Sequence, residues 1–128
     1  MKQITIDGKK YDIDCNGFTY LKYKTIFNSG IVSDIKKIQE YLIKQIYVSK
    51  HYEKKKISQE EKIIKISNCM QGDIDDFIIT ITKIAWILIY TANEEIDEYE
   101  KWLKSIKKID VQEDWISEVT EFAVDCFC

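Results

Sequence analysis

Proline and arginine are absent from this 128-residue sequence, and glycine occurs only four times. Average usage would give about six prolines and nine glycines. Because both residues interrupt helices and strands, their scarcity predicts long uninterrupted elements, as do the 24 isoleucines. Apolar residues account for 45% and charged residues for 32%, which is typical of a globular chain. We therefore expect a single domain over residues 1–128 that needs no cofactor, metal or disulfide to be stable.

The missing arginines argue against nucleic-acid binding, because base readout and bidentate phosphate contacts rely on the guanidinium group. All 19 basic residues are lysines, and with 22 acidic residues the net charge is -3. Residues 110–128 contain six acidic residues and no lysine. This acidic end predicts either a solvent-exposed helix face or a docking surface for a basic partner.

No segment predicts secretion or insertion into a membrane. The first ten residues contain no apolar run, and the most hydrophobic stretch, 77–92, contains Lys83 and is shorter than the roughly 20 residues of a membrane span. The four cysteines are therefore expected to be reduced and mostly buried. No metal site is expected, because Cys126 and Cys128 lack a second pair and His51 is the only histidine.

The N-terminal residues 1–15 predict a β-hairpin. Asp7-Gly8 is the favoured pair for a two-residue turn, and a turn there pairs Ile4 with Tyr11. Two strands alone are only marginally stable, so the apolar face of the hairpin is expected to lie on helices. The apolar side chains that share this face are Ile4, Ile6, Tyr11 and Ile13.

Residues 17–128 predict a compact bundle of about six helices, so the fold class is mainly α with an N-terminal hairpin. Four expected helices cover about 18–28, 33–52, 74–92 and 94–108. A further helix is expected to open at 58–61 and to be closed by Gly72, and a last helix is expected to open at 110–113 and to include Cys126. In the second helix, Ile35, Ile38, Leu42 and Ile46 form an apolar stripe that is expected to face the core. The helix at 74–92, the fourth in the chain, is apolar on nearly all sides, apart from a polar seam of Asp76, Thr80 and Lys83. Its length favours burial over a membrane span, so we place it at the centre of the bundle.

The residue patterns of common enzymes are missing. The chain has no glycine-rich phosphate loop. Its only histidine, His51, lies in a lysine-rich stretch, so no Ser-His-Asp or Cys-His catalytic unit is expected. Acidic clusters near 73–76 and 97–100 fall in or near first turns of helices, where carboxylates favour the helix dipole. We therefore expect a binding protein that is not an enzyme, and keep a site on the polar seam as the enzymatic alternative.

Three segments stand out after the opening ITIDGKKYDID. They are Ala85-Trp86 on a helix that runs into Thr91-Ala92-Asn93, then Tyr99-Glu100-Lys101-Trp102-Leu103, and then Asp114-Trp115 at the start of the last helix. In this order they resemble the tail assembly chaperones of long-tailed (siphovirus-type) bacteriophages and prophages. The resemblance extends over nearly the whole chain, and its motifs are structural.

The resemblance implies a chaperone that binds the long tape measure protein in the host cytoplasm and keeps it soluble. Such proteins also help to recruit subunits of the major tail tube protein, and are not kept in the mature virion. Many are also made in a longer form by a translational frameshift. The family offers no catalytic residues to transfer to this chain.

A surface for the partner is the remaining expectation. We expect exposed aromatic side chains of the second, fifth and last helices to contact apolar helical segments of the tape measure protein. The acidic row of the last helix is expected to favour basic segments of that partner, and surplus apolar residues suggest self-association. The alternative is a small regulatory or nucleic-acid-associated phage protein that uses Lys50–Lys56. The candidate partner-binding residues are Tyr41, Tyr47, Trp102, Trp115, Glu118 and Glu121.

Overall fold

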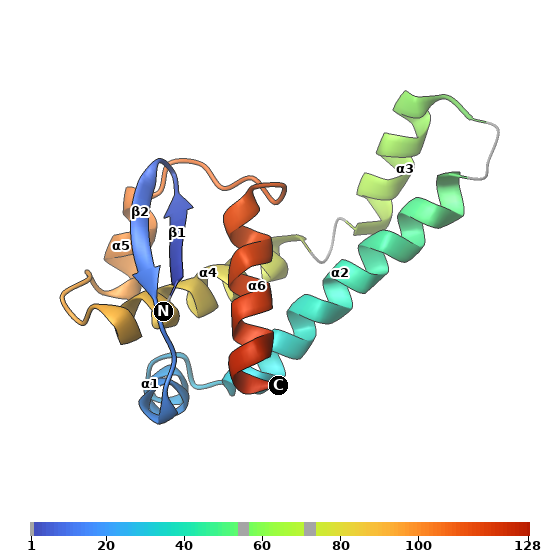
Figure 1. Cartoon of the computed structure of the whole chain (residues 1–128). Helices are drawn as coiled ribbons and strands as arrows, with labels where there is room; N and C mark the ends of the chain where they lie inside the picture. The colour runs from blue at the N-terminus through green and yellow to red at the C-terminus, as the bar shows by residue number, and fades with distance from the viewer. Residues whose placement is uncertain (1, 54–56, 71–73) are drawn as a thin grey trace.

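The chain folds into a mainly helical structure that begins with a two-stranded antiparallel hairpin, as the sequence predicts (Figure 1). The structure, a computed structural model, describes residues 2–53, 57–70 and 74–128. Its elements are β1 (Lys2–Ile6), β2 (Lys9–Ile13), α1 (Gly17–Phe27), α2 (Ile31–Glu53), α3 (Gln59–Met70), α4 (Ile74–Ala92), α5 (Tyr99–Ser105) and α6 (Asp114–Phe127).

The hairpin has the predicted turn and register. Asp7 and Gly8 both have positive φ, 51° and 80°, which is the backbone of a two-residue turn between antiparallel strands. Ile4 lies opposite Tyr11, as expected. The isoleucines on the inner face are fully buried, and β2 lies on α4 with the amide of residue 14 donating to the Leu88 carbonyl at 3.1 Å. Burial of this face stabilises two strands that would be marginal alone.

Helix α4 is the central helix of the fold. It is in contact with β2, α1, α2, α5 and α6. From Ile81 to Ile89 nearly every side chain is buried, and Lys83 is the exception. The indole of Trp86 donates to the Asp97 carbonyl at 2.9 Å, so this side chain also fixes the loop that follows α4. The all-round apolar pattern therefore identified the centre of the bundle correctly.

A buried polar cluster joins α1 to the first turn of α2. The hydroxyl of Tyr23 donates to Asp34 at 2.7 Å, and the hydroxyl of Ser29 donates to the same carboxylate oxygen at 2.6 Å. Lys37 lies 3.7 Å from the other oxygen of Asp34. Burial and the hydrogen bond to Asp34 raise the pKa of Tyr23 above its ordinary value. The cluster fixes the base of α2 against α1.

The last two helices begin later than the sequence predicts, and α5 also ends earlier. Asn93 accepts a hydrogen bond from the amide of Glu95 through its side chain, which forms a turn where a helix was expected to begin. Glu113 likewise accepts from the amide of Asp110, so residues 110–113 form a turn before α6. The expected caps at Gly72 and Asp73 lie outside the described residues.

Three cysteines differ from expectation. Cys15, just after β2, forms a disulfide with Cys126, near the end of α6, across a Cα to Cα distance of 6.6 Å. The expectation that these two are reduced is therefore wrong, because the fold brings together residues that are 111 positions apart. Cys128 is free and exposed, which also differs from the expected burial.

Helices α2 and α3 form a hairpin that extends away from the rest of the molecule (Figure 1). We call the part of α2 from Leu42 onward, together with α3, the arm. The buried side chains of α2 end at Tyr41, so the arm lies beyond the core. Its two helices pack on each other, and Lys62 donates to the carbonyl of Glu53 at 3.2 Å. Among the described residues, no helix is both long enough and apolar enough to cross a membrane.

Candidate docking surface on the arm

The arm exposes large apolar side chains on both of its helices. Ile46 was expected to face the core, but it is 56% exposed because the body of the molecule no longer covers α2 at this point. Exposed apolar side chains mark interaction surfaces in soluble proteins where they adjoin one another. The apolar side chains of the arm that are each more than half exposed, which we call the arm surface, are Ile43, Ile46, Tyr47, Ile63 and Ile64.

The arm surface has the spacing of a helix-docking stripe. On α2, Ile43, Ile46 and Tyr47 follow the i, i+3, i+4 pattern, which places them on one side of the helix. Ile43 and Tyr47 lie outside the stripe formed by residues 35, 38 and 42, so α2 is apolar on two faces. Only the first of these faces is covered by the body. An amphipathic partner helix could bury the second one.

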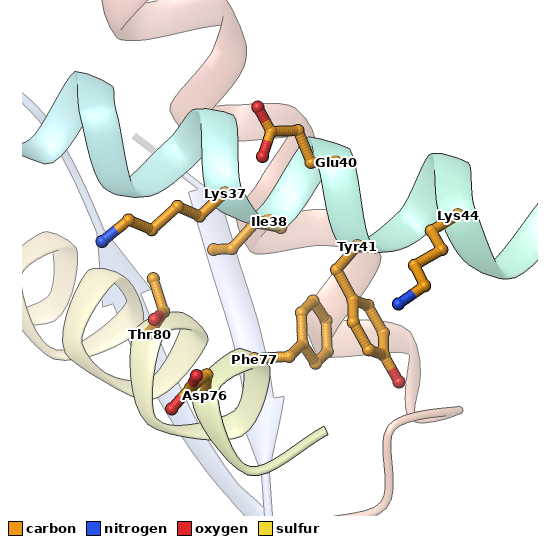
Figure 2. Close-up of a pocket in the computed structure, with 8 residues that line it drawn as sticks. All are labelled: Lys37, Ile38, Glu40, Tyr41, Lys44, Asp76, Phe77 and Thr80. Carbon is orange, nitrogen blue, oxygen red and sulfur yellow. The ribbon is translucent and has the colours of Figure 1, made fainter. Parts of the chain in front are cut away.

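A groove between α2 and α4 lies at the base of the arm (Figure 2). Its volume is about 370 Å³. The rings of Tyr41 and Phe77 stack with their centroids 4.2 Å apart and form an apolar wall. The charged and polar residues that line the rest of the groove are Lys37, Glu40, Lys44, Asp76 and Thr80. This mixture of signs around a stacked aromatic pair suits a side chain of a partner protein better than a charged reactant.

The polar seam of α4 does not form a single pocket. Asp76 and Thr80 line the groove against α2. Lys83 instead lies over the ring of Phe27, 5.4 Å from its centroid, in a second groove of about 850 Å³ between α1 and the loop before α5. Asp76 and Lys83 therefore do not share a site, and the enzymatic alternative gains no support from their placement.

Three of the four expected aromatic contacts are in the core. Tyr41 is 7% exposed, Trp102 is 3% exposed and Trp115 is 2% exposed, so the expectation that these side chains are exposed is wrong. Trp102 packs edge-on against Tyr11, which helps to fix the hairpin. Tyr47 is 73% exposed and is the one member of the expected set that belongs to the arm surface. Its role in binding stays a prediction.

The expected acidic row lies on the surface of α6. Glu121 and Asp125 are exposed, whereas Glu118 is partly covered and pairs with Lys2 at 3.6 Å. Residues 31–70, which include the arm, contain nine lysines and five acidic residues, a net charge of +4. Residues 110–128 carry a charge of -6. These two stretches of the sequence therefore carry net charges of opposite sign.

The alternative nucleic-acid surface and a metal site gain no structural argument. Lys50 is exposed, but residues 54–56 lie outside the described residues. Within the part of the chain that the structure describes, no three His, Cys, Asp or Glu side chains are placed to hold a metal ion. The sulfur of Cys126 is also committed to the disulfide.

The sequence does not single out Ile43, Ile63 and Ile64 as candidate docking residues. Isoleucine at a helical position normally indicates core, and these residues differ from core isoleucines only in what surrounds them. The one available signal was the second apolar face of α2. Comparison of the chain with protein-family models, with curated proteins and with solved structures gave no match.

Proposed function

We propose that this protein is a tail assembly chaperone of a long-tailed bacteriophage or prophage. In this role it binds the tape measure protein in the host cytoplasm, keeps it soluble and helps to recruit tail tube subunits, without remaining in the mature virion. The observation that supports the proposal is the arm surface, in which large apolar side chains are exposed along both helices of a projecting hairpin. The order of sequence segments that resembles this family supports it independently.

The physical requirements of the task fit such an arm. A tape measure protein is long, helical and rich in apolar segments, so a chaperone must cover these segments and later release them. An exposed stripe at i, i+3, i+4 spacing offers contact to one face of an amphipathic helix.

The test is co-expression with the product of a very long neighbouring reading frame, the expected tape measure protein. We expect wild-type protein to increase the soluble fraction of that partner and to be captured with it. The triple variant Ile43→Ser, Ile46→Ser, Tyr47→Ser is expected to lose most of both effects, because it removes apolar contacts from an exposed face. Phe18→Ser is the matched control, since Phe18 is an exposed aromatic outside the arm.

The outcomes distinguish an error in the proposed function from an error in the assigned binding surface. If wild-type protein neither captures nor solubilises the partner, the proposed function is wrong. If Phe18→Ser loses capture and the arm variant keeps it, the function stands and the assigned surface is wrong. The acidic row is tested by reversing the charges of Glu118 and Glu121, which is expected to weaken capture and its dependence on salt.

The neighbouring reading frames provide an independent test. A chaperone of this kind is expected to be encoded between a frame for a tail tube protein and a very long frame for a tape measure protein. Binding of the purified protein to DNA or RNA in a gel shift at physiological salt would instead favour the regulatory alternative.

A further inference from the structure

The outer edge of β2 has backbone groups that the hairpin does not use. Because a two-residue turn joins Ile6 to Lys9, these two residues exchange hydrogen bonds, and so does every second pair beyond them. The residues in between direct their N–H and C=O groups outward, and on β2 and just after it these are Lys10, Asp12 and Asp14. The amide of Asp14 donates to a carbonyl of α4 at 3.1 Å, whereas the outward backbone groups of Lys10 and Asp12 have no partner among the described residues.

The corresponding edge of β1 is covered by α6. This helix lies on the β1 side of the hairpin (Figure 1) and packs on the strand. The ion pair between Lys2 and Glu118, at 3.6 Å, joins the two elements. An added strand would lie about 4.8 Å from β1, next to the outward groups of Gln3 and Thr5, where α6 already approaches. The edge of β2 is therefore the more open one.

A groove of about 400 Å³ lies beside the outer edge of β2. All of residues 9–12 line it, although their side chains point to alternate faces of the hairpin, and no residue of β1 does. The groove therefore follows the edge of the strand and does not lie on one face. The loop after α4 and helix α5 form its other side, and Tyr11 and Ile96, both half-buried, give it apolar surface.

The unpaired backbone of this edge specifies what can occupy the groove. N–H and C=O groups at the spacing of a strand are satisfied by another extended chain. A volume of this size holds a ligand or a short segment and not a folded domain. In a second copy, β2 has the same loop beside its edge, so pairing of two such edges would bring both loops into the same space. The occupant that fits is a single extended segment.

The charged side chains beside the edge favour one order of charges in that segment. The charged residues that line the groove are Lys9, Lys10, Asp12, Glu95 and Asp97. Lys9 lies over the ring of Tyr11, and Asp97 pairs with Lys101 at 3.7 Å, so both are engaged within the molecule. Lys10 and Asp12 are exposed on the outer face of β2, and opposite charges directly across a strand pair stabilise it. Antiparallel pairing, the stronger kind per residue, places the basic residue of the segment before its acidic one.

We propose that the edge of β2 binds an extended segment of a partner polypeptide as a third, antiparallel strand. The backbone of the segment exchanges hydrogen bonds with Lys10 and Asp12. Its side chains are basic opposite Asp12, apolar opposite Tyr11 and acidic opposite Lys10. The arm takes no part, so this site goes beyond the function proposed above and does not depend on it.

The first test is amide hydrogen exchange, measured by NMR on isotope-labelled protein. The probe is the peptide Thr-Lys-Val-Glu-Thr with both ends blocked, which has the length of β2. In the free protein the amides of Lys10 and Asp12 are expected to exchange quickly, and at saturating peptide they are expected to exchange slowly. The amides of Gln3 and Thr5, on the edge of β1, are the internal control and should not change.

N-methylation of the peptide distinguishes strand pairing from ordinary apolar contact. In the antiparallel alignment the amides of its lysine and glutamate face β2, whereas those of its valine and last threonine face away. Methylation of the first pair is expected to weaken binding at least about tenfold, and methylation of the second pair by less than about threefold. Equal effects of the two methylated peptides would overturn the proposal.

Proline substitution tests the same contact from the side of the protein. Lys10→Pro removes an amide that the hairpin ladder does not use, so the fold is expected to persist, as thermal unfolding will show. It is expected to weaken peptide binding at least about tenfold. Lys10→Ala loses the charge but keeps the amide, and Thr5→Pro makes the same backbone change on β1. Both controls are expected to bind the peptide within about threefold of wild type.

Several results would overturn the proposal. Wild-type protein that does not bind the peptide at about 1 mM would reject the site. Loss of binding in Thr5→Pro but not in Lys10→Pro would show that the segment pairs with β1. A lower mass of Lys10→Pro than of wild type in sedimentation, without peptide, would show that a second copy occupies the edge. Because the methylated peptides test unmodified protein, the proposal stays testable if Lys10→Pro does not fold.

Discussion

Replacement of Tyr23 by Phe isolates one buried hydrogen bond at the base of the arm. Tyr23 comes from α1, and its hydroxyl donates to Asp34 in the first turn of α2 at 2.7 Å. The ring is fully buried and packs edge-on against Phe27. Phenylalanine keeps this packing and removes only the hydroxyl. The variant therefore measures how strongly the polar cluster joins the two helices.

The expected cost follows from the burial of the acceptor. Asp34 is 4% exposed, so water does not readily replace the lost donor. Hydrogen bonds to charged groups contribute about 1.5–3 kcal/mol, and Ser29 and Lys37 still satisfy part of the carboxylate. We expect Tyr23→Phe to lower the free energy of unfolding by about 2 kcal/mol at pH 7.

The same variant should remove a dependence of stability on alkaline pH. Burial, and then the hydrogen bond to Asp34, raises the pKa of Tyr23 in the folded state above its ordinary value of 10.0. Below pH 10 the tyrosine is protonated in both states, so it adds no pH dependence. Above pH 10 the unfolded chain releases the proton while the folded chain keeps it, so stability falls as pH rises. Between pH 9 and pH 11, Tyr23 is expected to lower the unfolding free energy of wild type by about 1.4 kcal/mol. Tyr23→Phe lacks this contribution, so its stability should not fall by this amount.

Urea unfolding followed by tryptophan fluorescence at pH 7, 9 and 11 measures both effects. The difference in unfolding free energy between wild type and Tyr23→Phe should shrink from pH 9 to pH 11, because only wild type loses the contribution of Tyr23. The other tyrosines contribute equally to both proteins and cancel in this difference. Tyr20→Phe, at a ring that is 45% exposed, is the control and is expected to change stability by less than about 0.5 kcal/mol. A Tyr23→Phe effect below about 0.5 kcal/mol at pH 7, or a difference that does not change with pH, would refute the reasoning.

Three further changes test other parts of the structure by the same unfolding assay. Trp86→Phe is expected to lower the free energy of unfolding by about 1 kcal/mol more than Trp102→Phe does. The reason is that the Trp86 indole donates to a backbone carbonyl, whereas the buried Trp102 indole nitrogen has no acceptor among the described residues. Equal effects of the two replacements would contradict this. Reduction of the disulfide between Cys15 and Cys126, or replacement of both by serine, is expected to cost about 2–5 kcal/mol, and stability unchanged by reductant would show that the bond does not form. Gly8→Ala is expected to cost about 1 kcal/mol because Gly8 has a φ of 80°, and a neutral effect would indicate a different turn.

Local chemistry explains why the hairpin and the central helix could be predicted. The Asp7-Gly8 turn fixes the register, because positive φ at both positions is rarely accessible to other residue pairs. Slippage by one residue would move Ile4 and Ile6 from the core to solvent. From Ile84 to Ile89 of α4, every side chain is apolar, so this part of the helix has no face suited to water and is buried. In both cases the sequence itself excludes the alternatives.

The docking surface could not be predicted from helical periodicity alone. A repeat of 3.6 residues shows which side chains of α2 share a face, but not how far along the helix another element covers that face. Ile38 and Ile46 belong to the same stripe, yet Ile38 is buried and Ile46 is exposed. Trp102 and Trp115 led to the opposite error, because large aromatics suit both cores and interfaces. The disulfide likewise depended on distant parts of the chain meeting in space.

The separation between core and arm makes the proposed binding experimentally accessible. Replacement of Trp102 or Trp115 would disrupt the core, so a lost interaction could reflect a lost fold. Side chains of the arm surface are already exposed, so their replacement removes little burial and is expected to leave the fold intact. A variant such as Tyr47→Glu that keeps its unfolding temperature while losing its partner can therefore be assigned to the surface alone.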